Sequence, residues 1–367
     1  MRFAAYSKTV LGISFSFLIF VMTVNYTVNP LGIYGTPVIE GVNDRYPTVS
    51  YFLRIHKTER LKQLRPDMLI TGTSRALIGL DPRPEIFGDE PVVYNTGLTA
   101  ARIYEQRCML EFAQAIRPLK RVIITLDFFA FAGAGPENEQ FEPQRCDPQS
   151  LHFPQNFRNR YNTLASLDTL VAVTKHFRYI RRPQKQSFIQ PNGRMQNNSL
   201  YHRIRENGAA PYFKNPPVPK GEKFTFSYGT DAADTSFRHV EAMLDITRRG
   251  DIDTVILFSP VHETMLAGLE EEGLQNAVAS WKSRITAIVQ ANALRYNAAP
   301  YPLWDFFERN SFTTEKIPED GDRETEMRWF TDSSHYTPAA GDIVLKKILG
   351  LYEAGQDPYP DFGKKLL

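Results

Sequence analysis

Short apolar runs alternate with longer amphipathic segments along most of the chain. Runs rich in Val, Ile and Leu, typical of buried strands, lie at residues 68–70, 92–94, 121–126, 254–258 and 303–306. Apolar residues at helical spacing lie beside them, at residues 48–64, 100–116, 237–249, 263–293 and 338–353. Strand, turn, helix and strand at this spacing form the parallel βαβ pattern. The sequence therefore predicts a three-layer α/β fold, with a mostly parallel sheet and helices on both faces.

A long stretch at residues 133–236 interrupts this alternation. It is rich in Pro, Asn, Gln and Arg, and helical periodicity is clear only at residues 167–180. Such a length without a regular pattern indicates an insertion over a functional face, or a mobile segment. Basic and aromatic residues are interleaved there: Arg178, Arg181, Arg182, Lys185, Arg194, Arg203, Arg205, Phe177, Tyr179, Phe188 and Tyr201. They suit either a groove for an anionic or sugar polymer, or a solvated surface whose aromatic residues pack on the core.

The N-terminal region contains an apolar segment of a different kind. Residues 9–28 are almost free of charge, and their length is about that of a bilayer span. Arg2 and Lys8 precede them, which predicts a cytoplasmic N-terminus. No small-residue cleavage site follows, so an uncleaved signal anchor is favoured over a cleaved signal peptide. With either, the remaining chain lies outside the cytoplasm, in the periplasm if the source is a Gram-negative bacterium.

The expected organisation follows from these segments. It comprises a cytoplasmic tip (residues 1–8), a single-pass anchor in the inner membrane (9–29), a connector with an amphipathic helix (30–65) and an α/β domain (66–367). With 42% hydrophobic residues, 25 Phe and 17 Tyr, the chain can fill a sizeable core. Its net charge of +2 gives no electrostatic support to a nucleic-acid partner.

The cysteine and histidine residues bear on two questions, whether the chain has a disulfide and whether it has a metal site. Cys108 and Cys146 either form one disulfide, which an extracytoplasmic location permits, or remain thiols, with Cys108 a small buried apolar residue. No cysteine or histidine spacing resembles a metal site, so neither a metal nor a cofactor is expected.

Candidate chemistry lies in two short motifs at opposite ends of the chain. Gly72-Thr73-Ser74 follows a predicted strand, at the sheet edge where open α/β folds place ligands, and Ser74 is a candidate nucleophile. Asp332 and His335 stand three residues apart, a spacing that lets a carboxylate orient an imidazole. If the fold brings these motifs together, they form a catalytic triad. If it does not, the first is a helix-capping turn and the second a surface turn.

These two motifs resemble blocks of the SGNH, or GDSL-like, hydrolase superfamily. Gly72-Thr73-Ser74 is similar to the first block, Gly-Asp-Ser, with Thr73 in place of the acidic residue. Asp332-Ser333-Ser334-His335 is similar to the last block, Asp-x-x-His, and lies at the expected place near the C-terminus. The resemblance extends over about residues 66–349 and implies a flavodoxin-like sheet with a serine nucleophile.

The resemblance also suggests residues that bind the substrate. Residues 92–100 are similar to the second block, in which a small residue donates a backbone N–H to the oxyanion hole. Ala100 is the best match, and Gly97 and Asn95 lie beside it. From the residues alone, His262 follows a predicted strand at the same sheet edge, where it binds substrate, acts as an alternate base, or simply begins a helix.

The third block departs from the family pattern. Members usually have Gly-x-Asn-Asp after the third strand, and its Asn completes the oxyanion hole, whereas this chain reads Leu126-Asp127-Phe128-Phe129-Ala130. Either another donor completes the hole, or turnover is poor, or the site is not hydrolytic. Arg75 is a candidate for that donor, and Asp127 is interpreted as a structural carboxylate at a strand end.

A membrane anchor and this first block are most similar to a divergent branch linked to cell-envelope polymers, which includes proteins of alginate O-acetylation and teichoic-acid D-alanylation. The resemblance implies a membrane-anchored serine esterase or O-acyltransferase that acts on a polysaccharide, with a membrane-bound acyltransferase as a possible partner. The alternatives are a non-catalytic polysaccharide-binding or scaffold protein, favoured by the missing Asn, and a lipase or thioesterase with the insertion as its lid.

Overall fold

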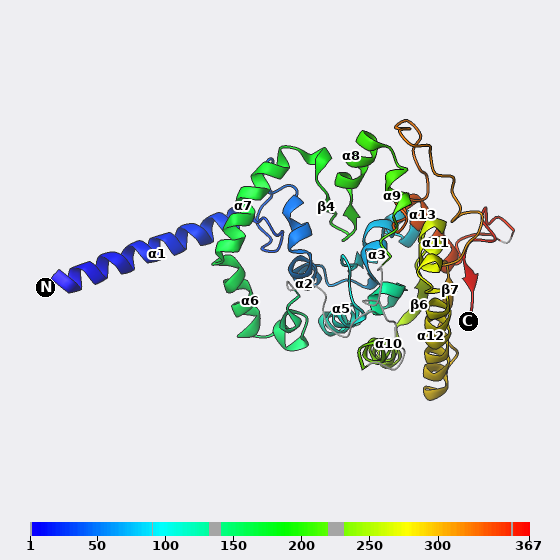
Figure 1. Cartoon of the computed structure of the whole chain (residues 1–367). Coiled ribbons are helices and arrows are strands. Elements are labelled where there is room, and N and C mark those ends of the chain that lie inside the picture. The colour runs from blue at the N-terminus through cyan, green and yellow to red at the C-terminus, as the bar shows by residue number, and fades with distance from the viewer. Residues whose placement is uncertain (1, 90, 132–140, 219–230, 354) are drawn as a thin grey trace.

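A computed structural model (Figure 1) describes residues 2–89, 91–131, 141–218, 231–353 and 355–367. Its central sheet has six strands in the order β2-β1-β3-β6-β7-β8. They are β1 (Met68–Thr71), β2 (Val93–Asn95), β3 (Arg121–Leu126), β6 (Asp253–Phe258), β7 (Leu303–Asp305) and β8 (Lys364–Lys365). All neighbours pair in parallel except β8, which is antiparallel to β7. The predicted α/β fold with a mostly parallel sheet is confirmed.

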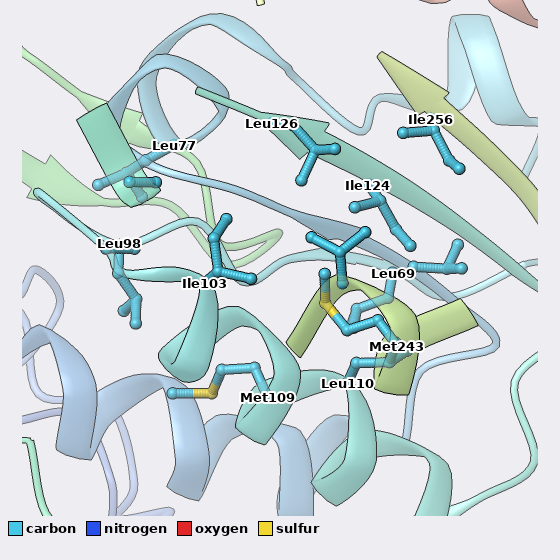
Figure 2. Packing of buried hydrophobic residues seen from close by; sticks show 14 of the residues in the cluster. Leu69, Leu77, Leu98, Ile103, Met109, Leu110, Ile124, Leu126, Met243 and Ile256 are labelled. Carbon is cyan, nitrogen blue, oxygen red and sulfur yellow. The ribbon is translucent and has the colours of Figure 1, made fainter. Parts of the chain in front are cut away.

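Helices cover both faces of the sheet because successive strand residues point to opposite sides. The flanking helices are α5 (Ile103–Ile116), α10 (Asp231–Arg249) and α12 (Gln275–Arg295) on one face, and α3 (Ser74–Gly79) and α13 (Pro338–Ile348) on the other. The first face contains Leu69, Ile103, Leu110, Ile124, Met243 and Ile256 (Figure 2). The second contains Ile70, Ala76, Ile123, Leu257, Ala340 and Val344. Burial of these two apolar clusters holds the three layers together.

The strand order determines where a ligand would bind. Counted among the parallel strands alone, it is 2-1-3-4-5, a common order in doubly wound sheets. In such sheets ligands bind outside the carboxyl ends of the strands, at the point where the order reverses. That point lies between β1 and β3, which pair directly with each other.

The prediction of a largely irregular insertion is wrong over its described part. Helix α7 (Leu167–Ile180) confirms the periodicity noted there, but further elements surround it. They are α6 (Gln155–Leu164), the hairpin β4 (Phe188–Ile189) and β5 (Met195–Gln196), α8 (Asn198–Asn207) and α9 (Pro211–Lys214). Helices α6 and α8 bury few side chains, only Asn159, Thr163 and Leu200, so neither has the wide buried apolar face that marks a core helix in the sequence. Residues 133–140 and 219–230 of this stretch lie outside the described residues.

Several predicted helices have different ends. The expected helix 263–293 is two helices, α11 (Glu263–Glu271) and α12, because Gly273 between them has a φ of +70°. The helix expected from residue 100 begins at Ile103, since Ala100 has a φ of +49°. Helix α13 ends earlier than expected, at Ile348. Helix α2 (Leu53–Leu64) begins later than expected, because a 3₁₀ turn (Pro47–Tyr51) precedes it. Helices α3 and α4 (Pro84–Phe87) and strand β8 are absent from the prediction.

Helix α1 (Arg2–Val28) extends away from the body of the protein (Figure 1). It is long and apolar enough to cross a membrane by length and composition, as predicted. Within the described part of the chain, its C-terminal part alone is buried against other segments, through Val21, Asn25 and Val28. The Asn25 amide donates to the carbonyl oxygens of Leu164 and Ser166, at 2.8 and 2.9 Å. The end of α1 is therefore bound to the turn between α6 and α7.

The two cysteines come together between α5 and the insertion. Cys108 lies on α5, and Cys146 follows a 3₁₀ turn (Pro143–Arg145). Both are free thiols, and a hydrogen bond between them is the largest influence lowering the pKa of Cys108. Of the two alternatives, the structure therefore contains the pair of thiols.

Candidate active site

Ser74 lies at the carboxyl edge of the sheet, where β1 ends. Gly72 follows the strand, and only glycine fits there, because a Cβ would lie 1.9 Å from Thr125 Oγ1 on β3. Thr73 caps α3, its hydroxyl accepting the N–H of Arg75 at 3.3 Å. The chain thus turns directly from strand to helix, and Ser74 is the first helical residue.

The loop before α13 is organised by a single carboxylate. Asp332 Oδ1 accepts the backbone N–H groups of Ser334 and His335, at 2.7 and 2.8 Å. Asp332 Oδ2 lies 2.9 Å from Nδ1 of the His335 ring. Burial alone would raise the pKa of Asp332, but the positive charge of the His335 ring when it is protonated, the bond from that ring and the two N–H groups outweigh burial and hold the pKa below 3.8. The ionised carboxylate therefore places the imidazole proton on Nδ1.

The two motifs meet, although 261 residues separate them in the sequence. Ser74 Oγ lies 2.8 Å from Nε2 of His335. Because Nδ1 carries the proton, Nε2 has a lone pair that can accept the hydroxyl proton of Ser74. A hydroxyl, an imidazole and a carboxylate in this order can carry out nucleophilic catalysis.

Arg75 joins the serine motif to the histidine loop. Its side chain is 4% exposed, and its Nε and Nη2 donate to the backbone oxygen and hydroxyl of Ser334, both at 3.0 Å. Its Nη1 donates to Asp127 Oδ1 at 2.8 Å, while the Thr73 hydroxyl donates to the other oxygen of Asp127. This buried ion pair makes further hydrogen bonds to Thr73 and Ser334, which offset the cost of its desolvation. These bonds use three of the five guanidinium N–H groups, and the role of Arg75 as an oxyanion donor stays a prediction.

Close packing of two helices sets the distance between serine and imidazole. Ser74 begins α3, and His335 stands just before α13, which packs against it. A Cβ at Gly341 on α13 would lie 1.8 Å from the carbonyl oxygen of Gly79 on α3. Only glycine at residue 341 therefore allows the two backbones to approach this closely.

A cavity of about 230 Å³ opens beside Ser74. It is lined by Thr73, Ser74, Arg75, Ala100, Ala101, Arg102, Asp127, Phe129, Ala130, Pro217 and Ser334. Among the described residues, no acceptor bonds to the backbone N–H of Ser74 or of Ala100. Ala100 is held in its left-handed conformation within the turn after β2. These two N–H groups are the candidate donors to an oxyanion formed at the serine.

Asn95 and Gly97, expected to contact substrate, bond within the protein instead. The side-chain Oδ1 of Asn95 accepts the N–H of Gly97 at 2.8 Å, and its side-chain Nδ2 donates to the backbone oxygens of Ala76 and Leu80. Asn95 is completely buried, and neither residue lines the cavity. They connect the turn after β2 to α3, so their effect on Ser74 is indirect.

His262 does not reach the site. Its Nδ1 accepts the N–H of Thr264 at 3.2 Å and its Nε2 donates to the carbonyl oxygen of Glu315 at 2.8 Å. Both ring nitrogens are engaged, and burial is the main cause that lowers the pKa of His262. Of the three interpretations of this residue, the structure favours the beginning of a helix, because His262 caps α11.

Several residues that line the cavity escaped sequence reasoning, among them Arg102, Phe129 and Pro217. Arg102 lines the cavity and donates from Nη1 to the backbone oxygen of Phe129 at 3.2 Å. Pro217 closes another side from within the insertion. The position of Arg102 two residues after Ala100 is a usable signal, but no local pattern marks Pro217 or Phe129. Of the basic residues in the insertion, Arg194 is buried against Asp81, at 2.9 Å, and is structural.

Within the described part of the chain, no group of three or more His, Cys, Asp or Glu residues is arranged to hold a metal ion. No family model matches the chain, and no curated protein matches it. The geometry of the Ser74 site therefore carries the functional argument.

Proposed function

We propose that the protein is a membrane-anchored serine esterase or O-acyltransferase that acts outside the cytoplasm on acyl esters of a cell-envelope polysaccharide or exopolysaccharide. The observation that carries this proposal is the 2.8 Å contact between Ser74 Oγ and Nε2 of His335, with Asp332 behind the ring. A hydroxyl in contact with an oriented, neutral imidazole is activated for attack on a carbonyl carbon.

The reaction proceeds in two halves. Ser74 Oγ attacks the acyl carbonyl while His335 takes its proton, and Asp332 stabilises the imidazolium. The oxyanion of the tetrahedral intermediate accepts the N–H groups of Ser74 and Ala100. His335 then gives its proton to the leaving alcohol, which leaves an acyl ester on Ser74. In the second half, His335 takes a proton from the molecule that attacks the acyl ester on Ser74. If that molecule is water, the reaction is hydrolysis, and if it is a sugar hydroxyl, the reaction is acyl transfer.

The resemblance to the SGNH superfamily supports the same chemistry. The acidic residue missing from the first block has a counterpart in Asp127, whose carboxylate accepts the Thr73 hydroxyl and pairs with Arg75. The third-block Asn has no equivalent among the residues that line the cavity. Because one oxyanion donor contributes about 10²–10³ to turnover, small generic esters will be poor substrates.

The proposed location follows from α1, which has the length and composition of a bilayer span. A single-pass anchor in the inner membrane with Arg2 and Lys8 on the cytoplasmic side leaves the α/β domain outside. An envelope polysaccharide and a membrane-bound acyltransferase that supplies acyl groups are then within reach.

The second candidate is a non-catalytic polysaccharide-binding or scaffold protein of an acylation complex. The missing oxyanion donor favours it. The hydrogen bonds from Asp332 to the His335 ring argue against this candidate. A turn with a purely structural role does not need an imidazole held against the Ser74 hydroxyl.

Active-site labelling separates the two candidates. We expect a fluorophosphonate probe to label the detergent-purified full chain once, and to label the Ser311→Ala control, which alters an exposed serine. The Ser74→Ala variant should remain unlabelled and should release no acetate from an acetylated polysaccharide. Labelling that persists in Ser74→Ala, or a wild-type protein inert in both assays, would leave the non-catalytic candidate standing.

A further inference from the structure

Large apolar side chains are exposed on α6 and α7, where α1 joins the body. On or next to α6, Phe153, Phe157 and Tyr161 follow one another at four-residue spacing, with ring centroids 6.1 Å apart in each neighbouring pair. On α7, Leu167 and Val171 have the same spacing. We call these five residues the α6–α7 apolar face. Soluble surfaces rarely leave such a group uncovered, so the face is expected to have an occupant.

The packing of α1 identifies that occupant. The apolar segment 9–28 has 20 residues, which as a helix is about 30 Å long, the thickness of a hydrocarbon core. Yet its last eight residues, about 12 Å of helix, already pack on the body through Val21, Asn25 and Val28. A bilayer that surrounds the whole segment therefore extends to the level of α6 and α7.

A shifted span leads to the same contact. If Lys8 extends its side chain to the cytoplasmic surface, residues 3–20 can form the span, about 27 Å long. The opposite bilayer surface then lies near Val21, where α6 and α7 begin to cover α1. Figure 1 shows both helices running across the direction of α1, as helices that lie along a membrane surface would.

The side chains suit a lipid surface rather than a protein pocket. Phe and Tyr collect at the boundary between hydrocarbon and water. Exposed cations accompany them, with Arg158 and Arg160 on α6 and Arg178 on α7, where they can meet lipid phosphates. An apolar stripe beside basic residues is the pattern of an interfacial helix.

We propose that the α6–α7 apolar face is a second membrane-contact surface, which lies in the headgroup region of the bilayer that α1 spans. It fixes the orientation of the α/β domain to the membrane, because a single helix alone would let the domain pivot. This inference rests on the anchoring by α1 in the proposed function, and it is independent of the chemistry at Ser74.

Quenching by brominated lipid tests the contact. The full-length protein is placed in nanodiscs of phosphatidylcholine brominated high on its acyl chains, and the emission of the native tryptophans is subtracted. Phe157→Trp and Leu167→Trp report on the proposed face, and Phe17→Trp reports on α1. Leu294→Trp is the matched control, since Leu294 is 83% exposed on α12 and Phe157 is 61% exposed.

We expect the added emission of Phe157→Trp, Leu167→Trp and Phe17→Trp to be quenched, and that of Leu294→Trp to match unbrominated nanodiscs. If only Phe17→Trp is quenched, the anchor stands and the second surface is wrong, which leaves a protein partner as the occupant. If Phe17→Trp is not quenched, the anchor and the second surface both fall. Fluorophosphonate labelling of Ser74 in the same samples tests the proposed catalytic function independently of the membrane contact.

Discussion

Asp332 binds both the backbone of its own loop and the ring of His335. Its Oδ1 accepts two backbone N–H groups and shapes the loop, and Nδ1 of His335 lies 2.9 Å from Oδ2 and 3.1 Å from Oδ1. The same residue therefore forms the turn and sets the tautomer of the base. This double use explains why a three-residue spacing is enough for both functions.

The Asp332→Asn variant separates these two functions. The amide oxygen still accepts the backbone N–H groups, but the amide N–H faces Nδ1, so the imidazole proton moves to Nε2 and the base is lost. We expect turnover of an ester to fall by about 10⁴-fold, as such an exchange does in a catalytic triad, with an unchanged circular dichroism spectrum. Activity within tenfold of the wild type would exclude the triad assignment.

In the proposed reaction, Arg75 is a positioning residue, because its side chain ties the loop of Ser334 to Asp127. The Arg75→Lys variant keeps a positive charge beside Asp127 but loses the planar fork that also bonds Ser334. A displacement of the histidine loop by about 1 Å costs roughly 10² in rate, so we expect kcat to fall by that factor at similar KM.

The matched control is Arg83→Lys, because Arg83 also pairs with α13, through Asp342, but its side chain is 41% exposed. It should leave both kinetic constants near the wild-type values. Equal losses in the two variants would show that Arg75 has no special effect on the site.

At the scale of elements, the approach of α3 and α13 decides whether the site forms. Strands β1, β3 and β6 are visible in the sequence as apolar runs, since a parallel strand is buried on both faces. The α3–α13 contact is not visible, because it depends on Gly79 and Gly341 meeting across 262 positions. Neither glycine belongs to a turn that a local pattern would mark.

A methyl group at residue 341 tests this contact. In Gly341→Ala the Cβ meets the carbonyl oxygen of Gly79, so α13 must move outward and His335 moves with it. We expect a loss of about 1–3 kcal/mol in unfolding free energy and slower labelling of Ser74. Thermal unfolding and the labelling rate measure the two effects. Lys346→Ala, on the exposed side of α13, should change neither, and a Gly341→Ala protein that labels at the wild-type rate would contradict the argument.

At the scale of the whole molecule, the region after α1 depends on a buried, neutral histidine. His56 Nδ1 donates to the carbonyl oxygen of Leu31 at 2.7 Å and so joins α2 to the connector. Complete burial is the largest cause that lowers the pKa of His56 from 6.5 to about 3. Burial also lowers the pKa values of His176, on α7, and His262.

These shifts predict how stability depends on pH. Between pH 6.5 and about 3 the unfolded chain binds a proton at residue 56 and the folded protein does not. His56 therefore makes the unfolding free energy fall as pH falls, by about 1.4 kcal/mol per pH unit. The His56→Gln variant retains a donor for the carbonyl oxygen of Leu31 but cannot bind a proton. The slope of its unfolding free energy against pH should therefore be smaller by the contribution of one proton, about 1.4 kcal/mol per pH unit. Denaturant midpoints at several pH values below 6.5 measure it, and an unchanged slope would contradict the prediction.

The sequence by itself determined the five parallel strands of the sheet, the apolar N-terminal helix and the two motifs around Ser74 and His335, because buried strands, bilayer spans and capped turns each leave a local pattern. Only the tertiary structure decided that these motifs meet, that Asn95, Gly97 and His262 bond within the protein, and that α6 and α7 lie beside α1. Such proximity arises from strand order and from the close approach of helices, and these depend on residues too far apart in the chain to leave a shared periodicity.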